Sequence, residues 1–128
     1  MLRIFLGINV LVWLPYGIFC FFQPDYLNEA AGLAIGSATA STEVRAMYGG
    51  LQASIGCFAL AALIRPELAR SALLAIAFLS SGLAVGRLGG ILADGGISGY
   101  TGGAVGFEIL LACSSFYLLS GDSVEAAA

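Results

Sequence analysis

The sequence predicts an all-α integral membrane protein, a bundle of four transmembrane helices with both termini in the cytoplasm. Hydrophobic residues make up 59% of the chain and charged residues only 10%, which is about half the charged fraction of a soluble domain. The chain also contains four apolar runs of about 20 residues, the length that a helix needs to cross about 30 Å of hydrocarbon. Segments rich in turn-forming residues separate these runs.

The four expected helices cover residues 4–22, 44–64, 71–92 and 102–119 of a single domain, residues 1–128. Pro24 ends the first helix because proline lacks the N–H that a continuing helix would use. Ser41 and Thr42 are the expected N-cap residues of the second helix. Arg65, Pro66 and Glu67 form a tight turn before the third helix. A glycine-rich segment, residues 93–99, then leads into the fourth.

The expected orientation follows from the arginines near the short loops. Arg3 precedes the first helix, and Arg65 and Arg70 flank the turn between the second and third helices. Because positively charged loops stay in the cytoplasm, these ends should be cytoplasmic in a bacterial inner membrane. The segments 25–42 and 93–100 should then face outward, and the acidic tail, residues 122–128, should face inward.

Polar residues follow one stripe on each expected helix. A polar stripe should face the bundle interior, because lipid offers no hydrogen-bond partners. The stripes are Asn9, Trp13, Tyr16, Cys20 and Gln23 on the first helix; Arg45, Tyr48, Gln52 and Gly56 on the second; Ser80, Ala84, Arg87 and Asp94 on the third; and Thr101, Glu108, Ala112 and Ser115 on the fourth.

The polar residues of different helices also agree in depth. Tyr16, Tyr48, Arg87 and Glu108 all lie about 6–10 Å below the outer end of their runs at about 1.5 Å per residue. A charge within a membrane is costly and normally pairs or lines a wet cavity. The simplest pairing is Glu108 with Arg87, with Arg45 as a second partner and the two phenols completing the network.

Three interpretations of this cluster stay open. In the first, it is a pocket open to the outer side that binds a carboxylate, a phosphate or a lipid head group, because guanidinium groups bind such anions well. In the second, the charges only fix helix register. In the third, Glu108 is the acid or base of a membrane enzyme acting on a lipid-like substrate. The candidate ligand-binding residues are Arg45, Tyr48, Gln52, Arg87, Glu108 and Tyr16.

The absence of other chemistry makes an enzyme the less favoured class. The chain has no histidine, and no nucleophile, metal-ligand or cofactor motif accompanies Glu108. Cys20, Cys57 and Cys113 are far apart in apolar runs, so neither a disulfide nor a metal site is expected. The net charge of −3 argues against a nucleic-acid partner. We therefore expect no cofactor, and membrane lipids as partners.

Glycine spacing gives a second signal. Gly82, Gly86 and Gly90 recur every four residues, and Gly49 and Gly50 stand beside Tyr48. Rows of small residues let membrane helices approach closely, so these five glycines are expected at helix contacts. The contacts are either within the chain or with another subunit. The second possibility supports an alternative function, a structural or accessory subunit of a homo-oligomer or a larger membrane complex.

Three sequence elements resemble a known family. They are Thr42-Glu43-Val44-Arg45-Ala46-Met47-Tyr48-Gly49-Gly50-Leu51-Gln52, then Gly86-Arg87-Leu88 followed by Asp94-Gly95, and finally Glu108. Together they are similar to the small bacterial membrane proteins grouped as domain of unknown function 4345, over nearly the whole chain. The resemblance implies a four-helix membrane protein and no particular activity.

Overall fold

The computed structural model describes residues 1–121, and these contain helices and turns but no strand. Four helical segments in this range are long and apolar enough to cross a membrane: Leu2–Phe22, Ala38–Ile64, Pro66–Asp94 and Gly99–Ser120. Each contains one of the four expected helices, so the number and order of the long helices are as the sequence predicts. The acidic tail expected in the cytoplasm, residues 122–128, lies outside the described residues.

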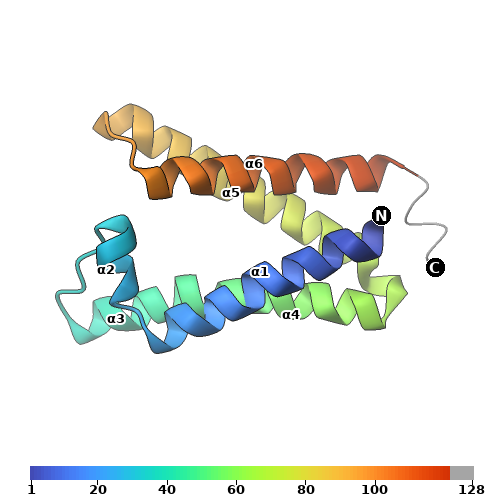
Figure 1. The fold of residues 1–128 in the computed structure, drawn as a ribbon, viewed down its shortest axis with the longest axis horizontal. Helices are drawn as coiled ribbons and strands as arrows, with labels where there is room; N and C mark the ends of the chain where they lie inside the picture. The colour runs from blue at the N-terminus through green and yellow to red at the C-terminus, as the bar shows by residue number, and fades with distance from the viewer. Residues whose placement is uncertain (122–128) are drawn as a thin grey trace. The chain divides into compact units, whose positions relative to one another are not determined.

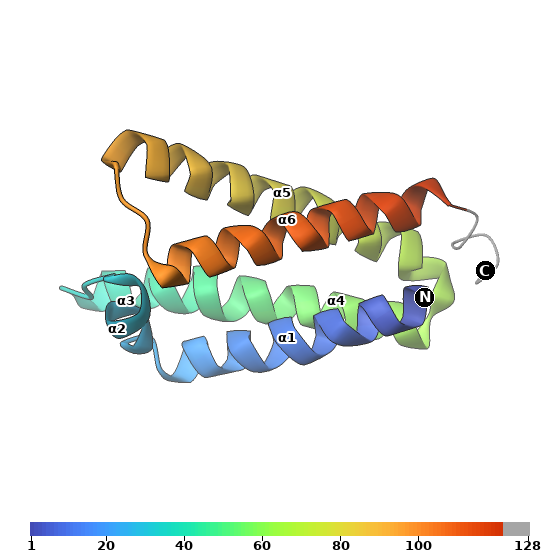
Figure 2. The ribbon, with the colours of Figure 1, turned by 45° about the horizontal axis from the view of Figure 1, so that its top comes forward.

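The chain divides into two compact units, Met1–Ala69 and Arg70–Ala128, called unit 1 and unit 2 below. Unit 1 contains α1 (Leu2–Phe22), α2 (Tyr26–Ala31), α3 (Ala38–Val44), η1 (Arg45–Gly50), α4 (Leu51–Ile64) and η2 (Pro66–Leu68). Its main contact is between α1 and α4, which lie side by side along most of their length (Figure 1, Figure 2).

The second long helix begins earlier than expected. Ser37, not Ser41 or Thr42, is its N-cap, because the Ser37 hydroxyl accepts a hydrogen bond from the Ala40 N–H at 3.1 Å. Thr42 lies inside the helix, where its hydroxyl donates to the Ala38 carbonyl at 3.0 Å. The segment expected to be a loop also contains the short helix α2. Its Leu27 is fully buried, so this segment is held by an apolar contact.

The middle of the second long helix contains a π-helical turn that periodicity did not predict. η1 covers Arg45–Gly50, and the N–H of Leu51 donates to the carbonyl of Ala46, five residues earlier. A π turn takes up about one residue more than an α turn, so it rotates the flanking segments by about 100° relative to each other. In a regular α-helix Arg45 and Gln52, seven residues apart, would lie within about 20° of one face, and the π turn between them changes this angle.

Three glycines explain how α1 and α4 approach so closely. A Cβ added to Gly17 of α1 would lie 2.3 Å from the backbone nitrogen of Ala53. A Cβ on Gly56 would lie 2.6 Å from the nitrogen of Leu14, and one on Gly49 would lie 2.9 Å from the Cα of Phe21. All three neighbours are backbone atoms, which cannot rotate away. Glycine at these positions therefore allows the backbones to pack directly together.

Unit 2 is an antiparallel hairpin of α5 (Ala69–Asp94) and α6 (Gly99–Ser120). The two helices diverge toward the loop that joins them (Figure 2). Ser98 caps α6, because its hydroxyl accepts a hydrogen bond from the Thr101 N–H at 3.1 Å. Away from the loop, the rings of Phe78 and Phe116 meet edge to face with centroids 6.0 Å apart.

Candidate functional site

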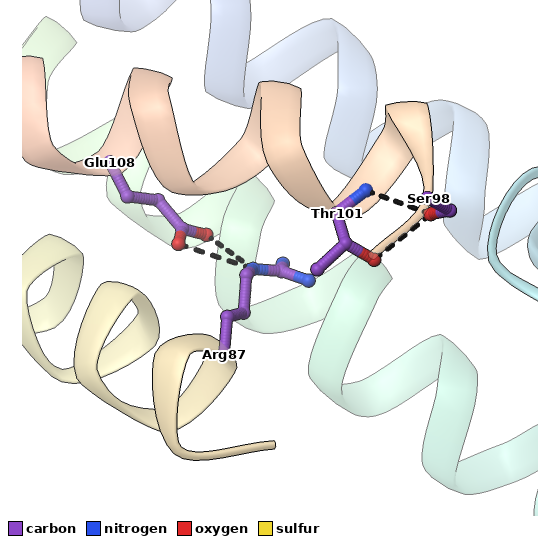
Figure 3. A network of polar contacts seen from close by, with 4 residues as sticks. All are labelled: Arg87, Ser98, Thr101 and Glu108. Carbon is purple, nitrogen blue, oxygen red and sulfur yellow. Dashed lines mark hydrogen bonds and ion pairs between the residues drawn. The ribbon is translucent and has the colours of Figure 1, made fainter. Parts of the chain in front are cut away.

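An ion pair joins the two helices of unit 2. Arg87 Nε lies 2.9 Å from Glu108 Oε1 and 3.1 Å from Oε2, so one N–H faces both carboxylate oxygens (Figure 3). The Glu108 side chain is 3% exposed and that of Arg87 is 19% exposed. The structure thus brings together Arg87 and Glu108, the two charges that are expected to pair because they lie at similar depth in their helices. The buried carboxylate has a cation beside it, as a charge removed from water requires.

The Arg87 guanidinium continues toward the start of α6. Its Cζ lies 5.9 Å from the centre of the Tyr100 ring, which is within the range of a cation–π interaction. In Figure 3 the guanidinium points along α6 toward Thr101, whose hydroxyl lies 3.0 Å from that of Ser98. Arg87 therefore contacts α6 at two positions, Glu108 and Tyr100. Both contacts lie toward the joining loop, where the two helices are farther apart.

Arg45 has a different environment, in unit 1. It donates a hydrogen bond to the backbone carbonyl of Phe21, and its Cζ lies 5.8 Å from the centre of the Phe21 ring. The last four carbonyls of a helix have no intrahelical partner, and Phe21 is the second-last residue of α1. Arg45 therefore caps the C-terminus of α1, where the helix dipole favours a cation.

The charge of Arg45 is not neutralised by this contact. The described residues, 1–121, offer Arg45 no carboxylate within ion-pair distance, and the side chain is half-buried. A guanidinium has five N–H donors, and the Phe21 carbonyl accepts from one Nη. The remaining donors and the positive charge are suited to an anion.

The other predicted ligand-binding residues also lie in unit 1. Tyr16 of α1 and Tyr48 of η1 are half-buried, and both have interactions within the chain. Gln52 is 6% exposed, and its Oε1 accepts no hydrogen bond from the described residues. Arg45 is directed toward α1, where it contacts Phe21, and Gln52 is buried at the start of α4.

The predicted glycines divide into two groups. Gly49 lies against Phe21, as described above, and a Cβ on Gly50 would have an ordinary 3.8 Å contact with the Arg45 carbonyl. A Cβ on Gly82, Gly86 or Gly90 would meet no atom within 4 Å. This row of α5 is therefore not packed against α6.

Sequence reasoning missed several residues that position these groups. The Phe21 carbonyl could not be found from residue type, because every residue has a carbonyl. Tyr100 lies at the start of its helix, outside the expected boundaries. Gly17 was also missed, whereas Gly56 belongs to the stripe predicted for the second helix and forms a row of small residues with Gly49 and Ala53 at helical spacing.

The described residues include no group of three or more His, Cys, Asp or Glu side chains that could hold a metal ion. Cys20 is a buried free thiol, and Cys57 and Cys113 are exposed free thiols.

Comparison with known proteins identifies a family. The model of the DUF4345 family, described as a domain of unknown function, matches residues 1–119. No curated protein and no solved structure matches the chain.

Proposed function

The chain belongs to the DUF4345 family, which assigns no activity, and we propose from the site itself that it is a small integral membrane protein that binds an anionic head group through Arg45. The ligand chemistry is a phosphate or carboxylate, supplied by a lipid or by a small free anion. The observation that carries this proposal is that Arg45, within a membrane-length helix, has no carboxylate within ion-pair distance among residues 1–121. Arg87, in α5, already has the carboxylate of Glu108.

The position of Arg45 along unit 1 supports a head-group ligand. Arg45 contacts Phe21, near the end of α1, so it lies at the level where that helix leaves the hydrocarbon. Phe21, Phe22 and Tyr26 are exposed at the same end, and aromatic residues are enriched at membrane interfaces. An arginine at this level needs little distortion to reach a lipid phosphate.

The proposed orientation places this end on the outer side of a bacterial inner membrane. Arg3 and Arg65 are exposed and lie at the opposite ends of α1 and α4, and Arg70, also exposed, follows Arg65 by five residues, which favours a cytoplasmic location for this part of the chain. Tyr48, Gln52 and Tyr16 remain proposed contributors to ligand binding. The proposed role of the Arg87–Glu108 pair is structural: it joins α5 to α6.

Lipid binding by purified variants tests the proposal. We would reconstitute each variant in phosphatidylcholine nanodiscs and measure its binding of labelled phosphatidylglycerol, with Arg45→Gln as the test variant and Arg3→Gln as the control at the opposite end. A charge-assisted hydrogen bond contributes about 1.5–3 kcal/mol, so Arg45→Gln should weaken binding about 10- to 100-fold. Arg45→Lys keeps the charge and should lose less. Equal binding by the native chain and Arg45→Gln would refute the proposal.

Competition separates the two sources of the anion. If a small free anion is the ligand, inorganic phosphate should displace the labelled lipid at millimolar concentration and should bind the native chain in plain phosphatidylcholine. If a lipid is the ligand, phosphate should compete weakly, because it lacks the acyl chains. Native mass spectrometry in mild detergent would report any lipid that remains bound after purification.

The second candidate function is a structural or accessory subunit. The open row of Gly82, Gly86 and Gly90 favours it, because small residues at this spacing suit close helix contacts. Gly86→Leu would fill the row, and it should reduce the fraction of any dimer or complex seen by native mass spectrometry. Gly7→Leu, at another glycine with no neighbour within 4 Å, is the matched control. A chain that is monomeric before and after both changes would exclude a homo-oligomer.

A further inference from the structure

Two serines lie on the same helix faces as the ion pair of unit 2. Ser80 precedes Arg87 by seven residues, and Ser115 follows Glu108 by seven. Seven residues are about two helical turns and return a side chain to within about 20° of its starting direction. Because α5 and α6 run antiparallel, both displacements point the same way along the hairpin. Ser80 and Ser115 therefore lie at one level, about 10 Å from the ion pair.

A contact between two aromatic rings independently supports this alignment of α5 and α6 along the hairpin. The rings of Phe78 and Phe116 meet with centroids 6.0 Å apart. Phe78 is two residues from Ser80, and Phe116 is adjacent to Ser115. The relative positions of the two serines along the hairpin therefore follow from contacts on either side of them.

Both serines are buried, and one has an unsatisfied hydroxyl. Ser80 is 1% exposed and Ser115 is 0% exposed. Ser115 Oγ has no hydrogen-bond partner among the described residues. A helical serine can satisfy itself by donating to a carbonyl four residues earlier, as Ser81 does to Ala77 at 2.7 Å. Ser115 does not, and a buried hydroxyl without a partner is unfavourable.

We infer that Ser80 and Ser115 bind a water molecule between α5 and α6. Each hydroxyl offers one donor and two acceptor lone pairs, and a buried water typically makes two to four hydrogen bonds to groups that lack other partners. Water fits better than a metal cation, because the nearest carboxylate on these faces, Glu108, is two turns away. Ala84, Leu111 and Ala112 are the buried residues between the two levels, so the serines form a second polar level separated from the ion pair by apolar side chains.

Water-edited solid-state NMR of the full chain in lipid bilayers tests this site. With ¹⁵N-labelled serine, magnetisation from water should reach the amides of Ser80 and Ser115 faster than that of Ser81, whose hydroxyl is satisfied by Ala77. In Ser115→Ala, transfer to Ser80 should fall to the level of Ser81. Alanine is the best helix former, so this variant keeps α6 intact. Ser114→Ala is the adjacent control and should leave transfer to Ser80 unchanged.

Two results would overturn the inference. One is slow transfer to both Ser80 and Ser115 in the native chain, which would mean that the hydroxyls bond to each other or to the backbone. The other is fast transfer to Ser80 that persists in Ser115→Ala, which would mean that any water there does not depend on Ser115. Neither result bears on head-group binding, because Arg45 lies in unit 1.

Discussion

Replacing Gly17 by alanine tests whether α1 and α4 are in direct backbone contact. The added Cβ would lie 2.3 Å from the Ala53 nitrogen, 2.7 Å from the Gly49 oxygen and 2.8 Å from the Ala53 Cα. Ordinary van der Waals contact begins at 3.4 Å, so the helices must separate by about 1 Å. Overpacking typically costs about 1–3 kcal/mol, and we expect the upper end because backbone atoms are in the way.

The same substitution also has a favourable effect, which a control isolates. Alanine is more favourable than glycine by about 1 kcal/mol in a helix interior. Gly7 lies in the same helix, α1, and a Cβ there would meet nothing within 4 Å. Gly7→Ala should therefore stabilise the protein by up to about 1 kcal/mol, whereas Gly17→Ala should destabilise it by about 2 kcal/mol after the two effects are combined.

Reversible unfolding in mixed micelles, followed by circular dichroism as the denaturing detergent is increased, would measure both variants. The expected result is opposite signs for the two changes, with a difference of about 3 kcal/mol in the free energy of unfolding. If Gly17→Ala were as stable as Gly7→Ala, α1 and α4 would not pack as described.

Three further predictions concern charged residues and orientation. Glu108→Gln should lower the free energy of unfolding by about 2–3 kcal/mol, which is less than the roughly 3–5 kcal/mol for a fully buried pair, because Arg87 is 19% exposed and the amide keeps one acceptor. The double variant, Arg87→Met with Glu108→Gln, should recover part of this loss. Strictly additive changes in the unfolding free energy would show that the two side chains are not coupled. Arg45→Met should speed hydrogen exchange at the end of α1, since the Phe21 carbonyl loses its cap; unchanged exchange would contradict the capping role. In a cysteine-free background, Ser98→Cys should react with an impermeant thiol reagent in intact cells and Glu67→Cys should not; the reverse pattern would invert the proposed orientation.

The long helices could be predicted from the sequence because length and apolar content decide whether a helix can span a membrane. The Arg87–Glu108 pair could also be predicted, because a charge without a partner is costly to place within a membrane. The π turn could not be predicted, because α-helical periodicity was assumed at every residue. The contact of Arg45 with the Phe21 carbonyl could not be predicted either, because residue type does not reveal a backbone partner.

The early start of the second helix was missed for a local reason. Ser37 and Ser41 are both plausible N-caps by residue type, and the apolar run that marks the membrane segment begins only at Val44. The helix extends beyond that run by more than one and a half turns, from Ala38 to Val44, because a cap depends on backbone geometry, not on hydrophobicity. Helix length and membrane-span length are therefore separate properties of this segment.

Because of the π turn, the direction in which the Arg45 side chain points depends on the number of residues between Arg45 and α4. A π turn can be regarded as one extra residue accommodated in an α-helix, so deleting Met47 would allow the segment to return to α-helical bonding. Every side chain on the N-terminal side of the deletion would then swing about 100° around the helix axis relative to α4. Arg45 would leave the Phe21 carbonyl without any change in its own identity or in the residues beside it. Among related sequences, a one-residue gap between Arg45 and Gln52 would thus alter this end of the molecule more than most substitutions there.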